Sequence, residues 1–278
     1  MKKINITDFK SITSVYRNKL PKRIVDNMRS LCLAAVSNAG WKLDHVPLEM
    51  IDKEMCLTAV RNSWKALPCV PLEMRDRKIC LAAVRNNGKA LQYVPEKLKD
   101  KKMCLAAVLK SPWVFEYVPK ELERELCLAV VRKDGWNLYH VYGNLRRDRE
   151  ICLAAVSNTG DALHSVPYEL RDREMCLIAV SNNGFALQYV PLELRDREMC
   201  LTAVSNHGDG LYDVPKELHY DREICLTAVT KDGGALELVP KELRDREMCL
   251  AAVKNNVHAL QFVPEQFRNE IRQELGIQ

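Results

Sequence analysis

The chain of 278 residues contains eleven cysteines, and these are its most obvious candidates for chemistry. Ten of them recur at intervals of 23 to 25 residues, and a leucine directly follows each one. The periodic cysteines are Cys32, Cys56, Cys80, Cys104, Cys127, Cys152, Cys176, Cys200, Cys225 and Cys249. Thiols in such number could form a disulfide framework, ligate zinc or supply a catalytic nucleophile.

The spacing of these cysteines argues against all three kinds of chemistry. Equivalent positions on stacked helices lie roughly 8–10 Å apart, whereas a disulfide requires Cα atoms within about 7 Å. The sequence contains no Cys-x-x-Cys pair and no Cys/His pair at zinc spacing. Cys69 is outside the series and has no base near it in the sequence. We therefore expect the periodic cysteines to be small buried apolar residues of a protein in a reducing compartment.

Other residue types give no catalytic pattern. The six histidines are scattered, and no pair has the spacing of metal ligands on one helix. Paired carboxylates such as Asp172 and Glu174 recur in most repeats, which is typical of helix starts. No glycine-rich phosphate-binding loop is present. We expect a protein with no enzymatic activity, no cofactor and no bound metal.

The same period predicts the secondary structure that carries the cysteines. A repeat of about 24 residues predicts a solenoid, in which each unit buries its apolar side against its neighbours. We predict an all-α fold, an α-solenoid or superhelix of about ten 24-residue repeats, each with one α-helix and a short helical turn. Residues 1–30 are expected to form an N-terminal helical cap, residues 31–263 the ten repeats and residues 264–278 a C-terminal capping helix.

Residues 196–219 show how one repeat is expected to fold. Asp196 is suited to cap an α-helix of about ten or eleven residues, with Cys200 at the centre of its apolar side. Gly208 is expected to end this helix, because glycine readily adopts the left-handed conformation common at helix ends. Pro215 limits the rest of the repeat to a short turn before it and a fresh turn after it.

Charge divides the chain near residue 140. Residues 1–139 contain 26 Lys and Arg against 15 Asp and Glu, a net charge of +11, whereas residues 140–278 contain 16 against 22, a net charge of −6. All four tryptophans lie in the first part. Tyr142 stands where a proline follows the other periodic valines, and the next connection is one residue longer. We expect a local irregularity at residues 139–147.

Two columns of equivalent positions vary in residue type, unlike the uniform scaffold positions. The column after the glycine position supplies the candidate partner-binding residues Trp41, Lys65, Lys89, Trp113 and Trp136. The column before the periodic valine supplies the candidates Tyr93, Tyr117 and His140. Variable outward columns favour a role in recognition, and the alternative is that their aromatic side chains cover the grooves between repeats.

The repeated phrase DREMCLxAVxNNGxALxxVPxELR resembles the repeats of the family known as domain of unknown function 4116. The resemblance covers roughly residues 30–265 and implies short α-helical repeats without any assigned catalytic residue. The family occurs in repeat-rich proteins of bacteria that live inside amoebae, and some members look like secreted effectors. The chain departs from the phrase where Trp64, Pro112 and Val257 replace the glycine.

A shorter phrase, AVSNHGDGL at residues 203–211, is similar to the loop of transcription-activator-like effector repeats. In those repeats the variable residue after an asparagine faces a base, which would imply contact with DNA here. Those repeats are, however, about ten residues longer. Any helix that ends in Asn-x-Gly produces the same phrase by capping, so capping is the alternative explanation.

These observations favour a non-enzymatic scaffold that binds another protein, as a bacterial or phage effector or inhibitor. The basic and aromatic first part would contact a partner with an acidic surface. Single-stranded RNA or DNA is the alternative partner, because exposed aromatic side chains beside lysines also suit stacking on bases.

The start of the chain has no apolar core of signal-peptide length, and no apolar run approaches the ~18 residues needed to span a membrane. We therefore expect no membrane partner. The expected location is the cytoplasm, which is reducing, or a host cytosol reached without a classical signal peptide.

Overall fold

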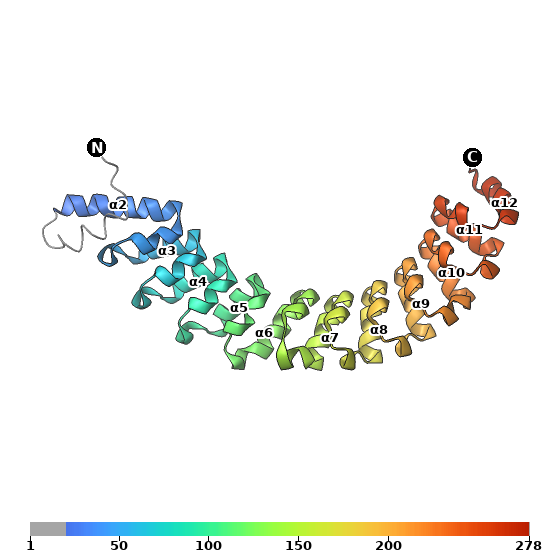
Figure 1. The fold of residues 1–278 in the computed structure, drawn as a ribbon, viewed down its shortest axis with the longest axis horizontal. Coiled ribbons are helices and arrows are strands. Elements are labelled where there is room, and N and C mark those ends of the chain that lie inside the picture. Colours follow the sequence, from blue (N-terminus) through green and yellow to red (C-terminus); the bar gives the residue numbers. More distant parts are fainter. Residues whose placement is uncertain (1–20, 278) are drawn as a thin grey trace. The chain divides into compact units, whose positions relative to one another are not determined.

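The computed structural model describes residues 21–277, which form helices and no strand. The chain divides into two compact units: unit 1 ends at Leu126 and unit 2 begins at Cys127. In both units α-helices alternate with short 3₁₀ helices along the chain (Figure 1). The prediction of an all-α fold is confirmed.

Eleven α-helices are described in residues 21–277, and ten of them carry one periodic cysteine each. Eight of them are ten residues long, as expected from the position of the capping aspartate. The α-helices are α2 (Lys22–Asn38), α3 (Lys53–Asn62), α4 (Arg77–Asn86), α5 (Lys101–Lys110), α6 (Lys120–Lys133), α7 (Arg149–Asn158), α8 (Arg173–Asn182), α9 (Arg197–Asn206), α10 (Arg222–Lys231), α11 (Arg246–Asn255) and α12 (Glu265–Leu275).

The short helical turn predicted after each α-helix is resolved into two 3₁₀ helices in most repeats. The first has six residues: η1 (Gly40–His45), η3 (Trp64–Cys69), η5 (Gly88–Tyr93), η7 (Pro112–Tyr117), η8 (Gly135–His140), η10 (Gly160–Ser165), η12 (Gly184–Tyr189), η14 (Gly208–Asp213), η16 (Gly233–Leu238) and η18 (Val257–Phe262). The second has three or five residues: η2 (Leu48–Met50), η4 (Leu72–Met74), η6 (Glu96–Leu98), η9 (Gly143–Arg147), η11 (Tyr168–Leu170), η13 (Leu192–Leu194), η15 (Lys216–Tyr220) and η17 (Lys241–Leu243).

Each unit is a stack with two layers. In unit 1, α2 to α5 pack on one another in chain order, and the six-residue 3₁₀ helices η1, η3, η5 and η7 do the same. In unit 2, α7 to α12 form one layer, and η8, η10, η12, η14, η16 and η18 form the other. The core between the layers consists of the periodic cysteine, alanine, valine and leucine, which are buried in repeat after repeat. Both units are therefore α-solenoids.

Each ten-residue α-helix begins at an aspartate that caps it. In α9 the Asp196 Oδ1 accepts a hydrogen bond from the backbone N–H of Met199 at 2.9 Å. This contact satisfies one of the amide donors that have no partner within the first helical turn. The equivalent aspartates of the other ten-residue helices act in the same way, so this part of the repeat follows the prediction.

The expectation that the periodic glycine adopts a left-handed conformation is wrong. His207 ends α9 with extended backbone (φ −139°), and Gly208 starts η14. Within residues 21–277 only Gly143 and Gly276 have positive φ. A Cβ at position 208 would lie 2.5 Å from the carbonyl oxygen of Ala228 in the next repeat. At this position glycine therefore avoids a clash with the backbone of the next repeat.

The last repeat has a larger residue at the position of this glycine. Val257 replaces the glycine at the start of η18, and its side chain is 47% exposed. The helix that follows is α12, which lacks the repeat's cysteine and capping aspartate. Trp64 and Pro112 also replace the glycine, although a helix with a periodic cysteine follows each of them, so the glycine is not required at every boundary between repeats.

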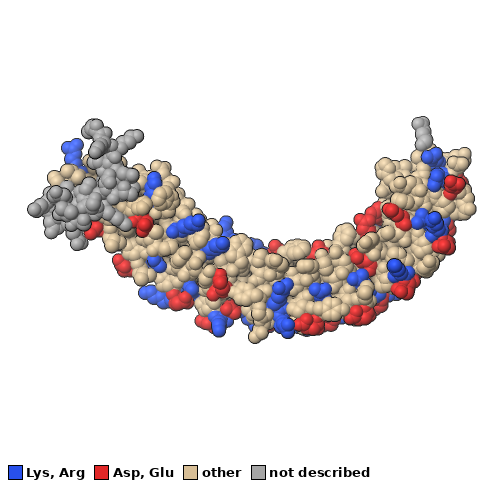
Figure 2. Space-filling model, in the orientation of Figure 1, with Lys and Arg blue, Asp and Glu red and all other residues tan. Residues whose placement is uncertain are grey.

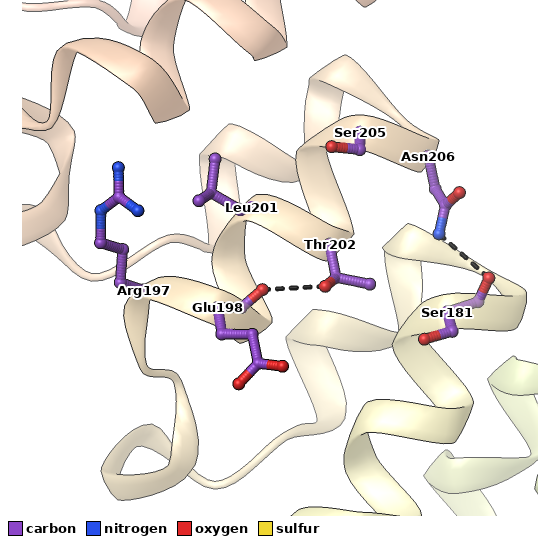
Figure 3. Close-up of a pocket in the computed structure, with 7 residues that line it drawn as sticks. All are labelled: Ser181, Arg197, Glu198, Leu201, Thr202, Ser205 and Asn206. Carbon is purple, nitrogen blue, oxygen red and sulfur yellow. Dashed lines mark hydrogen bonds between the residues drawn. The ribbon is translucent and has the colours of Figure 1, made fainter.

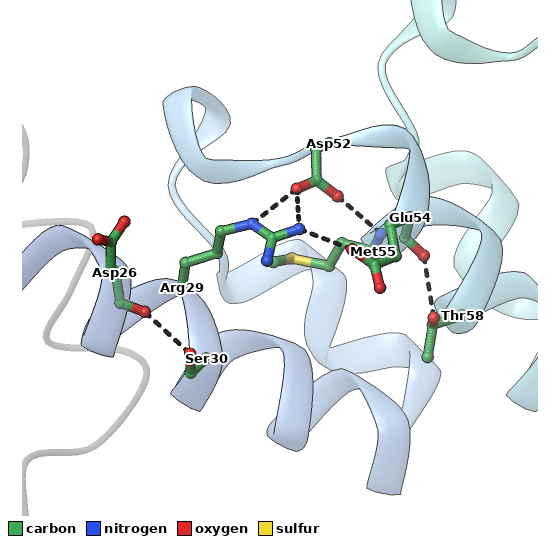
Figure 4. A network of polar contacts seen from close by, with 7 residues as sticks. All are labelled: Asp26, Arg29, Ser30, Asp52, Glu54, Met55 and Thr58. Carbon is green, nitrogen blue, oxygen red and sulfur yellow. Dashed lines mark hydrogen bonds and ion pairs between the residues drawn. The ribbon is translucent and has the colours of Figure 1, made fainter.

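Ion pairs join the starts of successive α-helices. The arginine of the Asp-Arg-Glu phrase reaches the Asp and the Glu of the next repeat: Arg222 Nη2 lies 2.9 Å from Asp245 Oδ2 and 2.5 Å from Glu247 Oε2. Figure 4 shows the same arrangement at the first repeat, where Arg29 bonds to Asp52 and Glu54. The phrase thus caps one helix and also links it to its neighbours, which the sequence analysis did not anticipate.

A second arginine joins the layer of 3₁₀ helices. Arg195 follows η13, and its guanidinium donates hydrogen bonds to the carbonyl oxygens of Gln188 at 3.1 Å, Val190 at 2.9 Å and Asp213 at 2.7 Å. The first two belong to its own repeat and the third to the next one. Arg75, Arg171 and Arg244 make the equivalent set of contacts. One planar donor group therefore holds three backbone acceptors in place.

Differences in repeat length are absorbed by the second 3₁₀ helix. Repeats with 25 residues between cysteines have five-residue helices, η9 and η15, which end directly at the capping aspartate. The 23-residue spacing before Cys127 coincides with loss of this helix, since α6 extends to 14 residues. The irregularity predicted at residues 139–147 corresponds to η9, which starts at Gly143 with φ +63°.

The two predicted capping segments can be compared with the helices at the ends of the described chain. Residues 1–20 of the predicted N-terminal cap lie outside the described residues, and the rest of it continues into α2 without a break. The segment predicted as a C-terminal capping helix contains α12, whose Ile271 is fully buried. Among the described residues, no helix combines the length and the apolar character that crossing a membrane requires.

Candidate partner-binding surfaces

The periodic cysteines do not form a reactive site. None of the eleven cysteines is in a disulfide, and ten of them are buried. Burial raises the pKa of Cys32 and Cys80 to about 11 and that of Cys200 to about 12, so these thiols stay protonated at neutral pH. No group of three or more potential metal ligands comes together within the described part of the chain.

The buried thiols have a polar contact that the sequence did not reveal. Cys225 Sγ donates to the carbonyl oxygen of His219 at 3.0 Å, and Cys152 Sγ donates to that of Arg146 at 3.2 Å. Similar but longer contacts recur in five other repeats. The thiol therefore satisfies a carbonyl at the end of the second 3₁₀ helix, which alanine or valine could not do.

Four of the predicted binding residues lie exposed on the layer of 3₁₀ helices in unit 1. Trp41 in η1 is 55% exposed, and Trp113 in η7 is 49% exposed. Lys65 in η3 and Lys89 in η5 are also exposed and occupy the equivalent position of the two repeats between them. The column therefore presents a tryptophan, two lysines and a second tryptophan on successive repeats.

Lysines lie close to both tryptophans of this column. Lys42 Nζ is 6.0 Å from the ring centre of Trp41, and Lys89 Nζ is 6.0 Å from that of Trp113. Both separations are within the range of cation–π attraction. Each indole therefore has a positive charge beside it as well as an exposed face.

The candidates from the second column are less accessible. Tyr93 and Tyr117 are half-buried, and the ring of Tyr93 stacks on Trp64 of the preceding repeat with centroids 6.4 Å apart. Trp64 and Tyr93 thus cover the groove between η3 and η5, which is the alternative role considered for these aromatics. Because these aromatic side chains are partly buried, they support the exposed column from within the stack.

The remaining two candidates belong to unit 2. Trp136 in η8 is 49% exposed, and His140 at the end of the same helix is half-buried with its ring 5.4 Å from that of Tyr139. They occupy the same repeat positions as the candidates of unit 1.

Three further cations lie beside the unit 1 column and were missed in the sequence. Arg61, Arg85 and Lys110 stand in the last turns of α3, α4 and α5, just before the 3₁₀ helices that carry the column, and are exposed. Positive charge is favourable there because the carboxyl end of a helix dipole is negative. In unit 2 the last turns of α7, α8 and α9 have no basic residue, whereas those of α10 and α11 carry Lys231 and Lys254.

We name these cations together the basic rim: Arg61, Lys65, Arg85, Lys89 and Lys110. None of the five makes an ion pair with any residue between 21 and 277, whereas the arginines at the helix starts of unit 1 do. Lys and Arg gather along the upper edge of α3 to α5 in the view of Figure 2. The basic rim is therefore positive charge that the fold itself does not neutralise.

The equivalent column of unit 2 carries carboxylates. Asp161, Phe185 and Asp209 occupy it on successive repeats. A hydrogen bond with the carboxyl of Asp232 raises the pKa of Asp209, and burial acts in the same direction. Burial likewise raises the pKa of Asp213, at the end of η14. This part of unit 2 therefore holds carboxylates in surroundings that disfavour their charge.

Open grooves separate neighbouring α-helices in unit 2. The one between α8 and α9 has a volume of about 670 Å³ and contains the seven residues drawn in Figure 3. Its polar groups are already used: Thr202 Oγ1 donates to the carbonyl of Glu198 at 2.8 Å, and Asn206 Nδ2 donates to that of Ser181 at 3.0 Å. No nucleophile with an adjacent base is found among its lining residues.

The contacts of Asn206 also bear on the Asn-x-Gly phrase. Its side chain donates to the carbonyls of Val180 and Ser181, which lie at the end of the preceding α-helix. Asn62, Asn182 and Asn255 make equivalent contacts. The asparagine thus caps the preceding helix, whereas the capping explanation placed the cap on the helix that the phrase ends.

Comparison with known proteins identifies one family. The model of the family described as Domain of unknown function (DUF4116) matches residues 76–123, 123–171, 172–219 and 221–268. Each matched segment spans two of the cysteine-centred repeats. No curated protein and no solved structure matches the chain.

Proposed function

Since the chain belongs to the family described as Domain of unknown function (DUF4116), which assigns it no activity, we propose its function from the surface of unit 1. The protein is a non-enzymatic binding module that captures another protein through the exposed column and the basic rim. The observation that carries this proposal is the combination of two half-exposed tryptophans with five cations that have no acidic partner in the described fold.

Tryptophan and arginine are the side chains that most often dominate protein–protein binding energies. Trp41 and Trp113 each present an indole that is about half exposed, on a rigid stacked scaffold. Holding these rings in place before binding lowers the entropy cost of association. The partner is expected to have apolar pockets for the two indoles and an acidic surface for the basic rim.

Single-stranded RNA or DNA is the second candidate, because the same tryptophans and cations could stack on bases and contact phosphates. The mixed charge of the unit 1 surface favours a protein partner over a nucleic acid. Asp44 in η1 and Glu116 in η7 are exposed on the same 3₁₀ helices as the two tryptophans. A surface that follows a phosphate backbone is usually more uniformly basic.

The function can be tested with the double variant Trp41→Ala/Trp113→Ala. The wild-type protein and the variant are used as baits in cell lysate, with and without nuclease, and captured proteins are identified by mass spectrometry. We expect one or more captured proteins to be lost from the variant, since removing a central tryptophan costs about 2 kcal/mol or more, roughly a 30-fold loss of affinity. Their capture should not depend on nucleic acid.

Tyr212→Ala is the matched control, because Tyr212 is an aromatic residue of unit 2 that is 78% exposed. This variant should retain the same proteins, and all three baits should have the same melting temperature. Capture that is unaffected by loss of both tryptophans would disprove the protein-binding proposal. Binding of a labelled single-stranded oligonucleotide that weakens steeply with salt would favour the second candidate instead.

A further inference from the structure

The two units present opposite charges at the same position of the repeat. After the glycine position, unit 1 carries Lys65 and Lys89 on η3 and η5, whereas unit 2 carries Asp161 and Asp209 on η10 and η14. The backbone around these positions is the same, because each is the second residue of a six-residue 3₁₀ helix. The two surfaces are therefore of similar form and of opposite sign.

The carboxylates of unit 2 lack cations of their own. Asn183 Nδ2 donates to Asp161 Oδ2 at 2.8 Å, but Asp161 Oδ1 is buried without a hydrogen-bond partner in the described residues. Asp209 lies against Asp232, so two acidic groups meet across the boundary between repeats. No ion pair involves Asp161, Asp209 or Asp232 within residues 21–277. A positive charge brought to this surface would relieve the repulsion between the paired carboxyls.

An aromatic pair lies between these carboxylates. Phe185 on η12 occupies the same column one repeat after Asp161 and one repeat before Asp209. Its ring lies 4.5 Å from that of His207, and Phe185 is 38% exposed. Unit 2 thus presents the order carboxylate, aromatic ring, carboxylate on three successive repeats. A lysine can pack its aliphatic stem on such a ring while its ammonium group reaches a carboxylate.

The basic rim of unit 1 carries the opposite charge, and its cations are likewise unpaired in the described part of the chain. Lys65 and Lys89 are exposed on adjacent repeats, and Arg61 and Arg85 precede them by four residues at the ends of α3 and α4. These cations have no acidic partner among residues 21–277. The acidic surface that the proposed function requires of a partner is thus present in unit 2 of the same protein.

We propose that the protein associates with a second copy of itself, the basic rim of unit 1 in one copy contacting Asp161, Phe185 and Asp209 of unit 2 in the other. This inference rests on the proposed function and names the partner of the same unit 1 surface. Each copy contributes one basic and one acidic surface, so every contact joins unlike units.

The test exchanges the charges that already occur in the column. The first variant is Lys65→Asp/Lys89→Asp, which gives unit 1 the aspartates of unit 2. The second variant is Asp161→Lys/Asp209→Lys, which gives unit 2 the lysines of unit 1. Both exchanges place at the column a residue type that other repeats hold there, so the fold should tolerate them. Molar mass is measured by sedimentation and light scattering over a range of protein concentrations.

We expect the wild-type protein to associate at low salt with a mass of at least twice that of the 31.8 kDa chain, and to dissociate as salt is raised. Each variant alone should be monomeric, because like charges then meet at the exchanged positions of the column. An equimolar mixture of the two variants should associate again, since the exchanged surfaces are complementary. Recovery in the mixture would not occur if the substitutions had merely damaged the fold.

The control Lys97→Glu/Glu242→Lys changes the same number of charges on η6 and η17, where both residues are exposed. It should associate like the wild-type protein. A wild-type chain that stays monomeric up to roughly 100 µM at low salt would overturn the self-association. So would a mixture of variants that stays monomeric. If lysate proteins are still captured in a tryptophan-dependent manner, the proposed function survives that result.

Discussion

Units 1 and 2 are built from one repeat but present different surfaces. In both units an aspartate caps the α-helix, an arginine bridges to the next repeat and a glycine allows close stacking. The position after that glycine holds only tryptophan and lysine in unit 1, whereas in unit 2 it holds Trp136, Asp161, Phe185, Asp209, Gly234 and His258. Contacts that hold the stack together are thus separated from residues that can change without disturbing it.

This separation has a physical reason. Scaffold positions contact the next repeat through backbone atoms or fully buried side chains, so each substitution there affects two repeats at once. The second residue of the six-residue 3₁₀ helix instead extends toward solvent, as Trp41 and Lys89 do. Surface chemistry can therefore differ between the units while the fold stays the same.

The largest effect is expected at the stacking glycine, and it should be equal in the two units. An added Cβ at Gly88 or Gly208 would overlap the carbonyl oxygen of Ala107 or Ala228 in the next repeat. We predict that Gly88→Ala and Gly208→Ala each lower the free energy of unfolding by about 3 kcal/mol, measured by urea denaturation.

Gly210 supplies the control within the same 3₁₀ helix as Gly208. A Cβ at position 210 would lie 3.5 Å from the nearest atoms of Ala203, an ordinary contact. Gly210→Ala should therefore be neutral or stabilising by up to about 1 kcal/mol. A marked difference between the Gly88 and Gly208 variants would show that the two units are not the same scaffold.

A smaller effect is expected from the arginine that holds three carbonyls. Arg75 in unit 1 and Arg195 in unit 2 make equivalent hydrogen bonds within their own repeat and to the next. Replacing either by alanine should cost about 2 kcal/mol of unfolding free energy, because three backbone acceptors lose a charged donor.

Arg85→Ala provides the comparison for that measurement. Arg85 belongs to the basic rim and makes no ion pair within the described chain, so its loss should change stability by less than about 0.5 kcal/mol. If Arg75→Ala and Arg85→Ala had equal effects, the three hydrogen bonds would not be what stabilises this contact.

The smallest effect on stability is expected at the contact between Asp209 and Asp232 in unit 2. The described part of unit 1 has no equivalent of this contact. The hydrogen bond with Asp232 raises the pKa of Asp209, so the wild-type fold gains stability as pH falls through that raised pKa. Asp209→Asn should stabilise the protein at pH 7 by less than about 1 kcal/mol, since both groups are partly exposed to solvent.

This gain should shrink as the pH is lowered, because Asp209 of the wild-type protein becomes neutral too. Thermal melts between neutral and acidic pH measure it directly. Asp161→Asn is the control, and it should bring no gain because Asp161 already accepts a hydrogen bond from Asn183. A stabilisation by Asp209→Asn that grew toward low pH would contradict the assigned direction of the shift.

The repeat length, the capping aspartate and the buried cysteine were all predictable from the sequence, because the same residue types recur at the same position of nearly every repeat. The reason for the glycine was not, since it depends on the distance to Ala228 in another repeat. The same holds for Arg222, whose carboxylate partners lie 23 and 25 residues further along the chain.

The candidate surface was predictable in part. Trp41 and Trp113 were found because their column varies in residue type, whereas the scaffold positions are uniform. Arg61 and Arg85 were missed because an arginine near a helix end is common, and its significance depends on the absence of an acidic neighbour in space. Unpaired charge is a property of the fold that spacing alone does not reveal.

The second 3₁₀ helix has a consequence for how such chains change over generations. It holds three residues in most repeats and five in η9 and η15, yet the capping aspartate and the α-helix after it keep their places. A single codon gained or lost in this segment is taken up locally and does not shift the register of the repeats that follow. The repeat array can therefore tolerate insertion or deletion of a residue in this helix. Its repeats can vary in length more freely during evolution than a strictly fixed period would permit.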